Sequence, residues 1–338
     1  MEDPAGMSRR MHVCLIGTFL IAALALPDLG WARSRHADPP PTPAPTASPS
    51  PSPAPKLLSS VVKDMHIASA DLWLRLRERV DPTAASRPSV AALFIHGSLF
   101  PGVPTFDRDA ADSWLAAALA KGVDPYLLDL DGYGESMPPR ARDVAALPRA
   151  ESDVAAAVAA IAPTHPGGVA LVGYDYGGDV AALYALAHPV ARLVLVAPLL
   201  RPDSQETVLT HPLLRSWLGS EVSDDVAERA IDMALLGTRD AGRRLPPALV
   251  IPAGVLASVA RPPLTPDTLE ALSVPTLLVR GRSDALFSSD DARALTQSAR
   301  NVKVLEVAGD HQLPWENGGL EAARRIADFL SITGTEVH

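Results

Sequence analysis

Three side chains with complementary chemistry stand at separate points of the sequence, namely Asp175, Asp284 and His311. A carboxylate can attack an electrophilic carbon, and an imidazole can take a proton from water. A second carboxylate orients such an imidazole. Each group follows a predicted strand, and the carboxyl ends of parallel strands meet at one edge of a sheet. We therefore expect Asp175, Asp284 and His311 to form one catalytic site.

Asp175 occupies the centre of a glycine-rich turn. The apolar run Val169–Val172 leads into Gly173–Gly178 (GYDYGG), and Val180–Ala187 has a helical pattern. Small flanking residues allow the central side chain to stand clear of the backbone on a sharp strand-to-helix turn. Ser is the usual residue at that apex, so Asp175 changes the chemistry that the turn predicts.

The candidate oxyanion donors follow a strand that ends in His96-Gly97. Glycine lets the backbone turn, so that the N–H of Ser98 or Leu99 points into the site, paired with the N–H of Tyr176 after the elbow. The elbow is the glycine-rich turn of residues 173–178 around Asp175. We interpret His96 itself as a histidine that supports the fold rather than as a catalytic base.

The elements that must position these groups alternate between strand and helix. Strands are predicted over Val90–Ile95, Pro125–Leu130, Val169–Val172, Val190–Val196, Thr276–Val279 and Val302–Val307, the first two of them buried, after a hairpin of Val61–Ile67 and Asp71–Val80. Helices are predicted over Ala110–Ala120, Glu151–Ile161, Val180–Ala187, Ala292–Ala299 and Leu320–Leu330. This alternation predicts an α/β fold with a mostly parallel central sheet, right-handed crossovers and helices on both faces.

The alternation stops between residues 198 and 273, a segment called the insertion below. It contains helical patterns over Glu206–Leu218 and Asp224–Leu236 and loops broken by proline pairs. We interpret it as a helical lid, because the sheet pattern resumes directly afterwards. The alternative is a second small helical domain without a catalytic role.

The N-terminal residues have the composition of an export signal and a linker. A basic segment, Ser8–Arg10, precedes the apolar run Val13–Leu26 and the small-residue cleavage pattern of Gly30–Ala32. Residues 1–32 are therefore predicted to be a signal peptide, with an uncleaved signal anchor as the alternative. We expect the protein to be exported, and we expect a membrane tether only if this segment is uncleaved. Residues 33–56 are rich in Pro, Ala, Ser and Thr and are predicted to be a disordered linker. Residues 57–333 form the remaining domain.

Composition limits the partners. The formal net charge of −9 gives no basic footprint, so we expect a small-molecule substrate and no nucleic acid. The chain has one cysteine, Cys14 in the apolar run, so the mature chain is expected to have no disulfide. No metal-ligand spacing and no phosphate loop occur, and no metal or other cofactor is predicted.

These motifs together resemble the α/β-hydrolase fold superfamily over about residues 57–332. The resemblance rests on the His-Gly strand end, the D-x-x-G-x-G-x-S pattern at residues 129–136, the elbow, and G-x-x-D and G-x-H patterns that end in Asp284 and His311. The second pattern departs from the family because Asp131 stands where Arg is usual.

With Asp at the apex, the chain resembles the haloalkane and haloacetate dehalogenases and the epoxide hydrolases. A carboxylate can displace halide or open an epoxide at a saturated carbon and form an alkyl-enzyme ester. His311, oriented by Asp284, then activates water to hydrolyse the ester. Attack of the same carboxylate on an ester substrate would give a mixed anhydride, which is a poor route.

The leaving-group site matches none of these families. Similar epoxide hydrolases use tyrosines of the lid to protonate the epoxide oxygen, yet no Tyr follows Tyr184 in this chain. Haloalkane dehalogenases have Trp directly after the nucleophile and haloacetate dehalogenases have Arg, whereas this chain has Tyr176. Tyr176 and, in the insertion, Trp217 are the candidates for contact with substrate or leaving group, and His211 and Arg215 are further candidates for binding halide or carboxylate. The alternatives to a dehalogenase or epoxide hydrolase are a hydrolase of the same fold with an undetermined, ester-like substrate, and a non-catalytic binding homologue.

Overall fold

The computed structural model describes residues 60–70, 72–136, 146–198, 208–239, 241–259 and 264–332. These residues belong to one compact unit, Pro55–His338. The predicted signal peptide and linker lie outside the described residues, as do residues 199–207 and 260–263 of the insertion. None of the described helices is long and apolar enough to cross a membrane.

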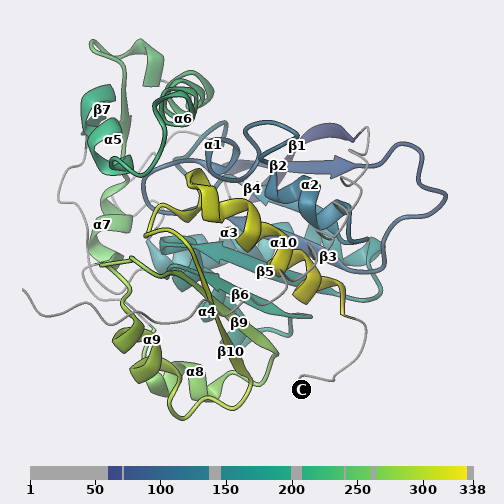
Figure 1. Cartoon of the computed structure of the whole chain (residues 1–338). Coiled ribbons are helices and arrows are strands. Elements are labelled where there is room, and N and C mark those ends of the chain that lie inside the picture. Colours follow the sequence, from purple (N-terminus) through teal and green to yellow (C-terminus); the bar gives the residue numbers. More distant parts are fainter. Residues whose placement is uncertain are drawn as a thin grey trace, which may run out of the picture. The chain divides into compact units, whose positions relative to one another are not determined.

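A central sheet of eight strands carries the site (Figure 1). Its strand order is β1-β2-β4-β3-β5-β6-β9-β10. The strands are β1 (Val61–Ser69), β2 (Leu72–Val80), β3 (Ala91–Ile95), β4 (Asp124–Leu128), β5 (Val169–Tyr174), β6 (Leu193–Val196), β9 (Thr276–Gly281) and β10 (Val302–Val307). All neighbours pair in parallel except β1 with β2 and β2 with β4. The predicted hairpin and mostly parallel sheet are confirmed.

The four strands in the middle of the sheet are buried at every residue, β3, β4, β5 and β6. Such continuous burial explains their unbroken apolar sequences, because helices cover both faces of the sheet. The main helices of the unit are α1 (Gly102–Phe106), α2 (Trp114–Leu119), α3 (Leu147–Ile161), α4 (Tyr176–Ala187), α9 (Ser289–Thr296) and α10 (Asn317–Ser331). Helix α10 packs against α2 and α3 packs against α4, and Figure 1 shows α10 crossing the near face of the sheet.

Two helix boundaries differ from the prediction for local reasons. Helix α2 begins at Trp114 rather than Ala110, because the side chain of Ser113 accepts the N–H of Ala116 and caps the helix there. Helix α4 begins at Tyr176, so the glycines of the elbow form its first turn instead of preceding it. The short helix α1, which contains Gly102 and Pro104, was not predicted.

The insertion between β6 and β9 is not purely helical. It contains α5 (His211–Leu218), α6 (Asp224–Gly237), α7 (Ala253–Val259), α8 (Pro266–Ala271) and a small antiparallel sheet of β7 (Val208–Thr210) and β8 (Ala248–Val250). The two predicted helices are present, with α5 starting later than expected, and the small sheet is an addition. Gln312, beside His311, donates from Nε2 to the carbonyl of Trp217 in the insertion at 3.1 Å. The insertion therefore contacts the histidine loop.

Candidate active site

The elbow places Asp175 between β5 and α4 in a rare backbone conformation. Its φ is 51° and its ψ is −126°, outside the regions that residues with a side chain prefer. Such strain persists only where the surroundings enforce it, and it occurs most often at functional sites. A Cβ on Gly177 would collide with the carbonyl oxygens of Ile95 and His96 in and after β3. Glycine at this position thus lets the elbow pack directly against the neighbouring strand.

One oxygen of the Asp175 carboxylate is held by a single residue. Oδ2 accepts hydrogen bonds from the Ser98 N–H at 2.6 Å and from the Ser98 hydroxyl at 2.7 Å. A Cβ on Gly97 would lie 2.5 Å from this oxygen, so only glycine allows the approach. The backbone donor from this loop that reaches Asp175 is therefore that of Ser98, while the oxyanion roles of Leu99 and Tyr176 stay predictions.

His311 is oriented by Asp284, as expected from the sequence. Its Nδ1 lies 3.1 Å from Asp284 Oδ2. The other oxygen of Asp284 accepts the N–H groups of Leu286 and Phe287 at 2.9 and 2.8 Å. These bonds fix the carboxylate, which in turn fixes the plane of the imidazole and places a proton on Nδ1. Nε2 is then the nitrogen available for proton transfer.

The free nitrogen of His311 faces the free oxygen of Asp175. His311 Nε2 lies 3.8 Å from Asp175 Oδ1, which is an ion-pair distance but too long for a direct hydrogen bond. Within the described part of the chain, neither atom has a hydrogen-bond partner. Both side chains are buried, at 1% and 3% exposure for the whole residues. The three groups expected from the sequence therefore meet in one buried site.

The charges of the site are coupled. Burial disfavours the charged form of His311, but the Asp175 and Asp284 carboxylates outweigh burial and raise its pKa to about 10. Burial likewise raises the pKa of Asp175, yet His311 and the two bonds from Ser98 lower it below its usual value. Asp175 is thus held as a carboxylate, which is the form that a nucleophile requires.

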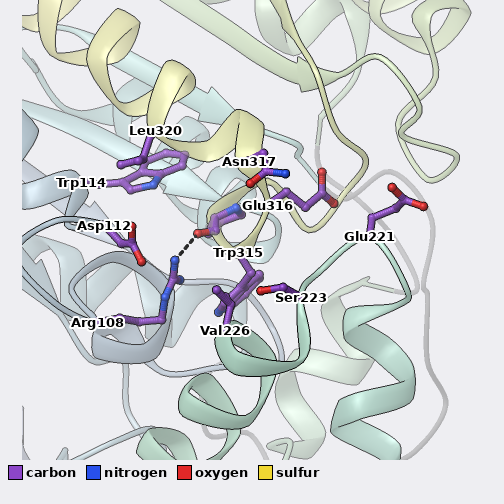
Figure 2. Close-up of a pocket in the computed structure, with 11 residues that line it drawn as sticks. Arg108, Asp112, Trp114, Glu221, Ser223, Val226, Trp315, Glu316, Asn317 and Leu320 are labelled. Atoms are coloured by element: carbon purple, nitrogen blue, oxygen red, sulfur yellow. Dashed lines mark hydrogen bonds between the residues drawn. The ribbon is translucent and has the colours of Figure 1, made fainter.

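Contacts on both sides hold the loop that carries His311. The Tyr174 hydroxyl donates to the His311 carbonyl at 3.1 Å, and Glu316 accepts the N–H of Asp310 at 2.8 Å. Arg108 Nη2 donates to the Pro314 carbonyl at 2.9 Å, and both residues line a cavity of about 130 Å³, of which Figure 2 gives a close-up. This loop is therefore tied to the body of the unit at the histidine and after it.

Trp217 belongs to an aromatic cluster next to His311. Its ring centroid lies 5.7 Å from those of Phe100 and Trp315, and Trp315 lies 5.8 Å from Tyr174, whose ring is 5.8 Å from that of His311. Phe100 and Trp315 were not singled out from the sequence, although each follows a site motif by a few residues. The structure thus places Trp217 near the site through packing, and its contact with substrate stays a prediction.

Tyr176 is fully buried at the start of α4. Burial is the main cause that raises its pKa, and a side-chain hydrogen bond with Ser258 in α7 opposes the rise. The predicted contact residue therefore faces the insertion. The other two candidates of the insertion are paired near the surface, His211 with Glu228 at 2.8 Å and Arg215 with Asp224 at 2.6 Å.

His96 has the structural role expected of it. Its Nδ1 lies 2.7 Å from the Gly97 carbonyl and its Nε2 accepts the Leu130 N–H at 3.1 Å. Tyr133, which sequence reasoning had not assigned, donates its hydroxyl to the Ser98 carbonyl at 2.6 Å. It therefore braces the residue that holds Asp175.

Asp131, the departure from the family pattern, has a compensating partner. Its Oδ2 lies 3.5 Å from Arg149 Nε on α3, and its N–H donates to Asp153 on the same helix at 3.0 Å. Asp131 is negative where the family pattern has a positive Arg, and the positive Arg149 on α3 lies beside it. Among the described residues, no group of three His, Cys, Asp or Glu is arranged to hold a metal ion.

Comparison with known proteins agrees with the fold. The model of the alpha/beta hydrolase family matches residues 92–329. No curated protein matches the sequence. A serine hydrolase involved in carbazole degradation (CarC enzyme) has a similar structure, with a TM-score of 0.60 at 15% identity over 81% of this chain and 100% of that chain.

Two other solved structures show the same likeness. The thioesterase domain from the curacin biosynthetic pathway gives a TM-score of 0.58 at 15% identity, over 80% of this chain and 100% of that chain. An esterase from Thermogutta terrifontis gives 0.56 at 20% identity, over 79% and 98%. At these identities the likeness shows the fold alone. The family match and the fold together show that this chain belongs to the alpha/beta hydrolase family.

Proposed function

We propose that this chain is a hydrolase that uses Asp175 as a nucleophile and forms a covalent alkyl-enzyme ester with a small organic halide or an epoxide. The proposal rests on the different contacts that the two carboxylate oxygens of Asp175 make. Oδ2 is bound twice by Ser98, whereas Oδ1 faces His311 Nε2 at 3.8 Å and has no hydrogen-bond partner among the described residues. Oδ1 is therefore the oxygen that attacks.

The first step forms a bond from Oδ1 to a saturated carbon of the substrate. The bond from that carbon to halide or to the ring oxygen of an epoxide breaks, and its electron pair leaves with the departing atom. Oδ2 becomes the carbonyl oxygen of the resulting ester. The Ser98 donors already point at this oxygen, so they need no rearrangement.

The second step hydrolyses the ester at the Asp175 carbonyl carbon. His311 Nε2 takes a proton from water while the water oxygen attacks that carbon, and Asp284 stabilises the imidazolium. Negative charge then develops on Oδ2, where the Ser98 N–H stabilises it. Collapse of this intermediate releases the alcohol oxygen, which takes the proton from His311. Asp175 is left as a carboxylic acid, which loses its proton to solvent and is restored as the carboxylate.

The two alternatives are less well supported. A carboxylate that attacked an ester would form a mixed anhydride, so Asp175 does not suit the chemistry of serine hydrolases of this fold. A binding protein without activity would not require His311 and Asp284 at 3.1 Å, with Asp284 fixed by two backbone donors.

Trapping the intermediate tests the proposal. In His311→Gln the first step remains and the water-activating base is lost, so we expect ester hydrolysis to slow by about 10²- to 10⁴-fold. Intact-mass spectrometry after incubation with a terminal alkyl bromide or a terminal epoxide should show the added mass, and peptide mapping should place it on Asp175. Asp175→Asn should show neither adduct nor turnover while keeping its fold.

His66→Gln is the matched control, because His66 is exposed on the edge strand β1. It should turn over substrate like the wild type without accumulating an adduct. Normal turnover by His311→Gln, or an adduct on a residue other than Asp175, would overturn the proposed function.

A further inference from the structure

A second carboxyl group stands one helical turn from the nucleophile. Asp179 lies in the first turn of α4, the helix that begins directly after Asp175. Its side chain is buried, at 1% exposure for the whole residue. Within the part of the chain that the structure describes, neither of its oxygens has a hydrogen-bond partner. Buried carboxyl groups without partners are rare in proteins.

Asp153, another buried carboxyl in this region, shows the usual arrangement. It accepts hydrogen bonds from the Ser69 hydroxyl at 2.8 Å and from the Asp131 N–H at 3.0 Å. These contacts give Asp153 a role in joining β1, the loop after β4 and α3. Asp179 makes no such contact, so a role in packing does not account for a carboxyl at this position.

The surroundings of Asp179 keep it in the acid form. Burial is the largest cause, and the charge of Asp175 is the second, and together they raise the pKa of Asp179 well above its usual value. Asp179 also contributes to the raised pKa of Tyr176. Asp179 is therefore within electrostatic reach of both Asp175 and the first residue of α4. The site therefore pairs a carboxylate nucleophile with a neutral carboxylic acid, an arrangement that divides acid and base roles.

The tyrosines around Asp175 already have other partners. The Tyr133 hydroxyl donates to the Ser98 carbonyl, and that of Tyr174 donates to the His311 carbonyl. Tyr176 shares a hydrogen bond with Ser258. Two acids near the nucleophile thus have a proton and no hydrogen-bond partner among the described residues, Asp179 and His311 at Nε2. Asp179 is the one of the two that the second step does not use as a base.

We propose that Asp179 is the proton donor to the leaving oxygen, and that the substrate is consequently an epoxide rather than an alkyl halide. This inference rests on the proposed function, because it requires Asp175 to attack carbon. A halide leaves as a stable anion, whereas the ring oxygen of an epoxide leaves as an alkoxide and needs a proton.

The step balances as follows. Asp175 Oδ1 forms a bond to a ring carbon, the bond from that carbon to the ring oxygen breaks, and the electron pair stays on the oxygen. That oxygen takes the proton from the Asp179 carboxyl, which becomes a carboxylate. After the ester is hydrolysed, Asp175 is released as a carboxylic acid and ionises, and its proton restores Asp179 through solvent. The net reaction adds one water to one epoxide and gives a diol.

The experiment compares two probes of equal chain length, 1,2-epoxyhexane and 1-bromohexane, in single turnover. Alkylation of Asp175 is followed by mass spectrometry in the His311→Gln background, with and without Asp179→Asn. Asn has nearly the shape of Asp but cannot give up a proton. We expect Asp179→Asn to slow alkylation by the epoxide by about 10²- to 10⁴-fold and to leave any alkylation by the bromide within about twofold. Asp267→Asn, an exposed carboxyl on α8, is the matched control and should change neither rate.

The outcomes separate this inference from the proposed function. Alkylation of Asp175 by the epoxide at equal rates with and without Asp179→Asn, or alkylation by the bromide alone, would overturn the role of Asp179 and leave the nucleophile standing. No adduct with either probe would overturn the proposed function, and the inference with it. An equal loss with both probes would show a structural role only.

A measurement on the His311→Gln protein, without any change at Asp179, guards against misfolding of the Asp179 variant. Alkylation by the epoxide should be slower in D₂O than in H₂O, because a proton moves in that step. Equal alkylation rates in the two solvents would count against proton donation.

Discussion

At the scale of single residues, the charge of Asp175 controls the basicity of His311. In the resting site two carboxylates outweigh burial and raise the pKa of His311 to about 10, so the imidazolium is present at neutral pH. In the proposed mechanism, formation of the ester removes the Asp175 charge while burial and Asp284 remain, so the His311 imidazolium releases a proton to solvent. The pKa of His311 therefore falls in the alkyl-enzyme, and His311 becomes a base only after the nucleophile has reacted.

This change predicts different pH dependences for the two steps. Alkylation should vary little from about pH 6 to about pH 9, because Asp175 is ionised throughout, its pKa being lowered by His311 and Ser98. Hydrolysis of the alkyl-enzyme needs neutral His311 and should slow as the pH falls through the pKa of His311 in that intermediate. Rapid-quench measurement of both steps checks the prediction. Ester hydrolysis that accelerates toward acid pH would contradict it.

At the scale of elements, a buried ion pair joins the loop after β4 to α3. Asp131 is fully buried and Arg149 keeps 27% of its side chain exposed, with 3.5 Å between the paired atoms. Removing one member of such a pair leaves a buried charge without compensation, which is costly. The partial exposure of Arg149 reduces that cost, because water screens its charge.

A double-mutant cycle measures this pair. We expect Asp131→Ala to lower the free energy of unfolding by about 1–3 kcal/mol, and Arg149→Ala to lower it by less because its charge is partly hydrated. The double variant should be more stable than the sum of the two losses predicts, by at least about 0.5 kcal/mol. Urea denaturation provides the three values. Strictly additive losses would show that the pair contributes nothing beyond its separate residues.

At the scale of the whole molecule, the residues of the described hydrophobic core all come from one part of the chain. Its buried apolar residues run from Leu72 to Leu330, and the strands and helices that carry them belong to the unit Pro55–His338. Folding of this unit should therefore not depend on the residues before it.

A shortened chain tests this independence. A protein that begins at Lys56 should have the same Tm as the full chain, because no buried apolar residue of the described core is removed. It should also keep the activity of the full chain, since Asp175, Asp284 and His311 lie within the retained part. Differential scanning calorimetry and a turnover assay provide the comparison. A markedly lower Tm would show that the first 55 residues contribute to the fold.

The sequence by itself determined the order of strands and helices, the elbow and the three catalytic candidates. These features are local, because burial on both faces produces apolar runs and the glycines that an elbow needs lie beside Asp175. The same local reasoning missed α1 and the small β7–β8 sheet, whose short segments are too brief to show a period.

Only the tertiary structure decided which atoms of the site contact which partners. The sequence predicted the Ser98 N–H as a donor into the site, but not that the Ser98 hydroxyl binds the same oxygen of Asp175, 77 positions away. The contact of Arg149 with Asp131 joins two elements and leaves no pattern in the sequence. The same holds for Asp179, which looks like an ordinary residue in the first turn of a helix until its burial and lack of partners are known. Contacts between distant segments depend on how the whole sheet and its helices pack, and packing is what a linear sequence does not display.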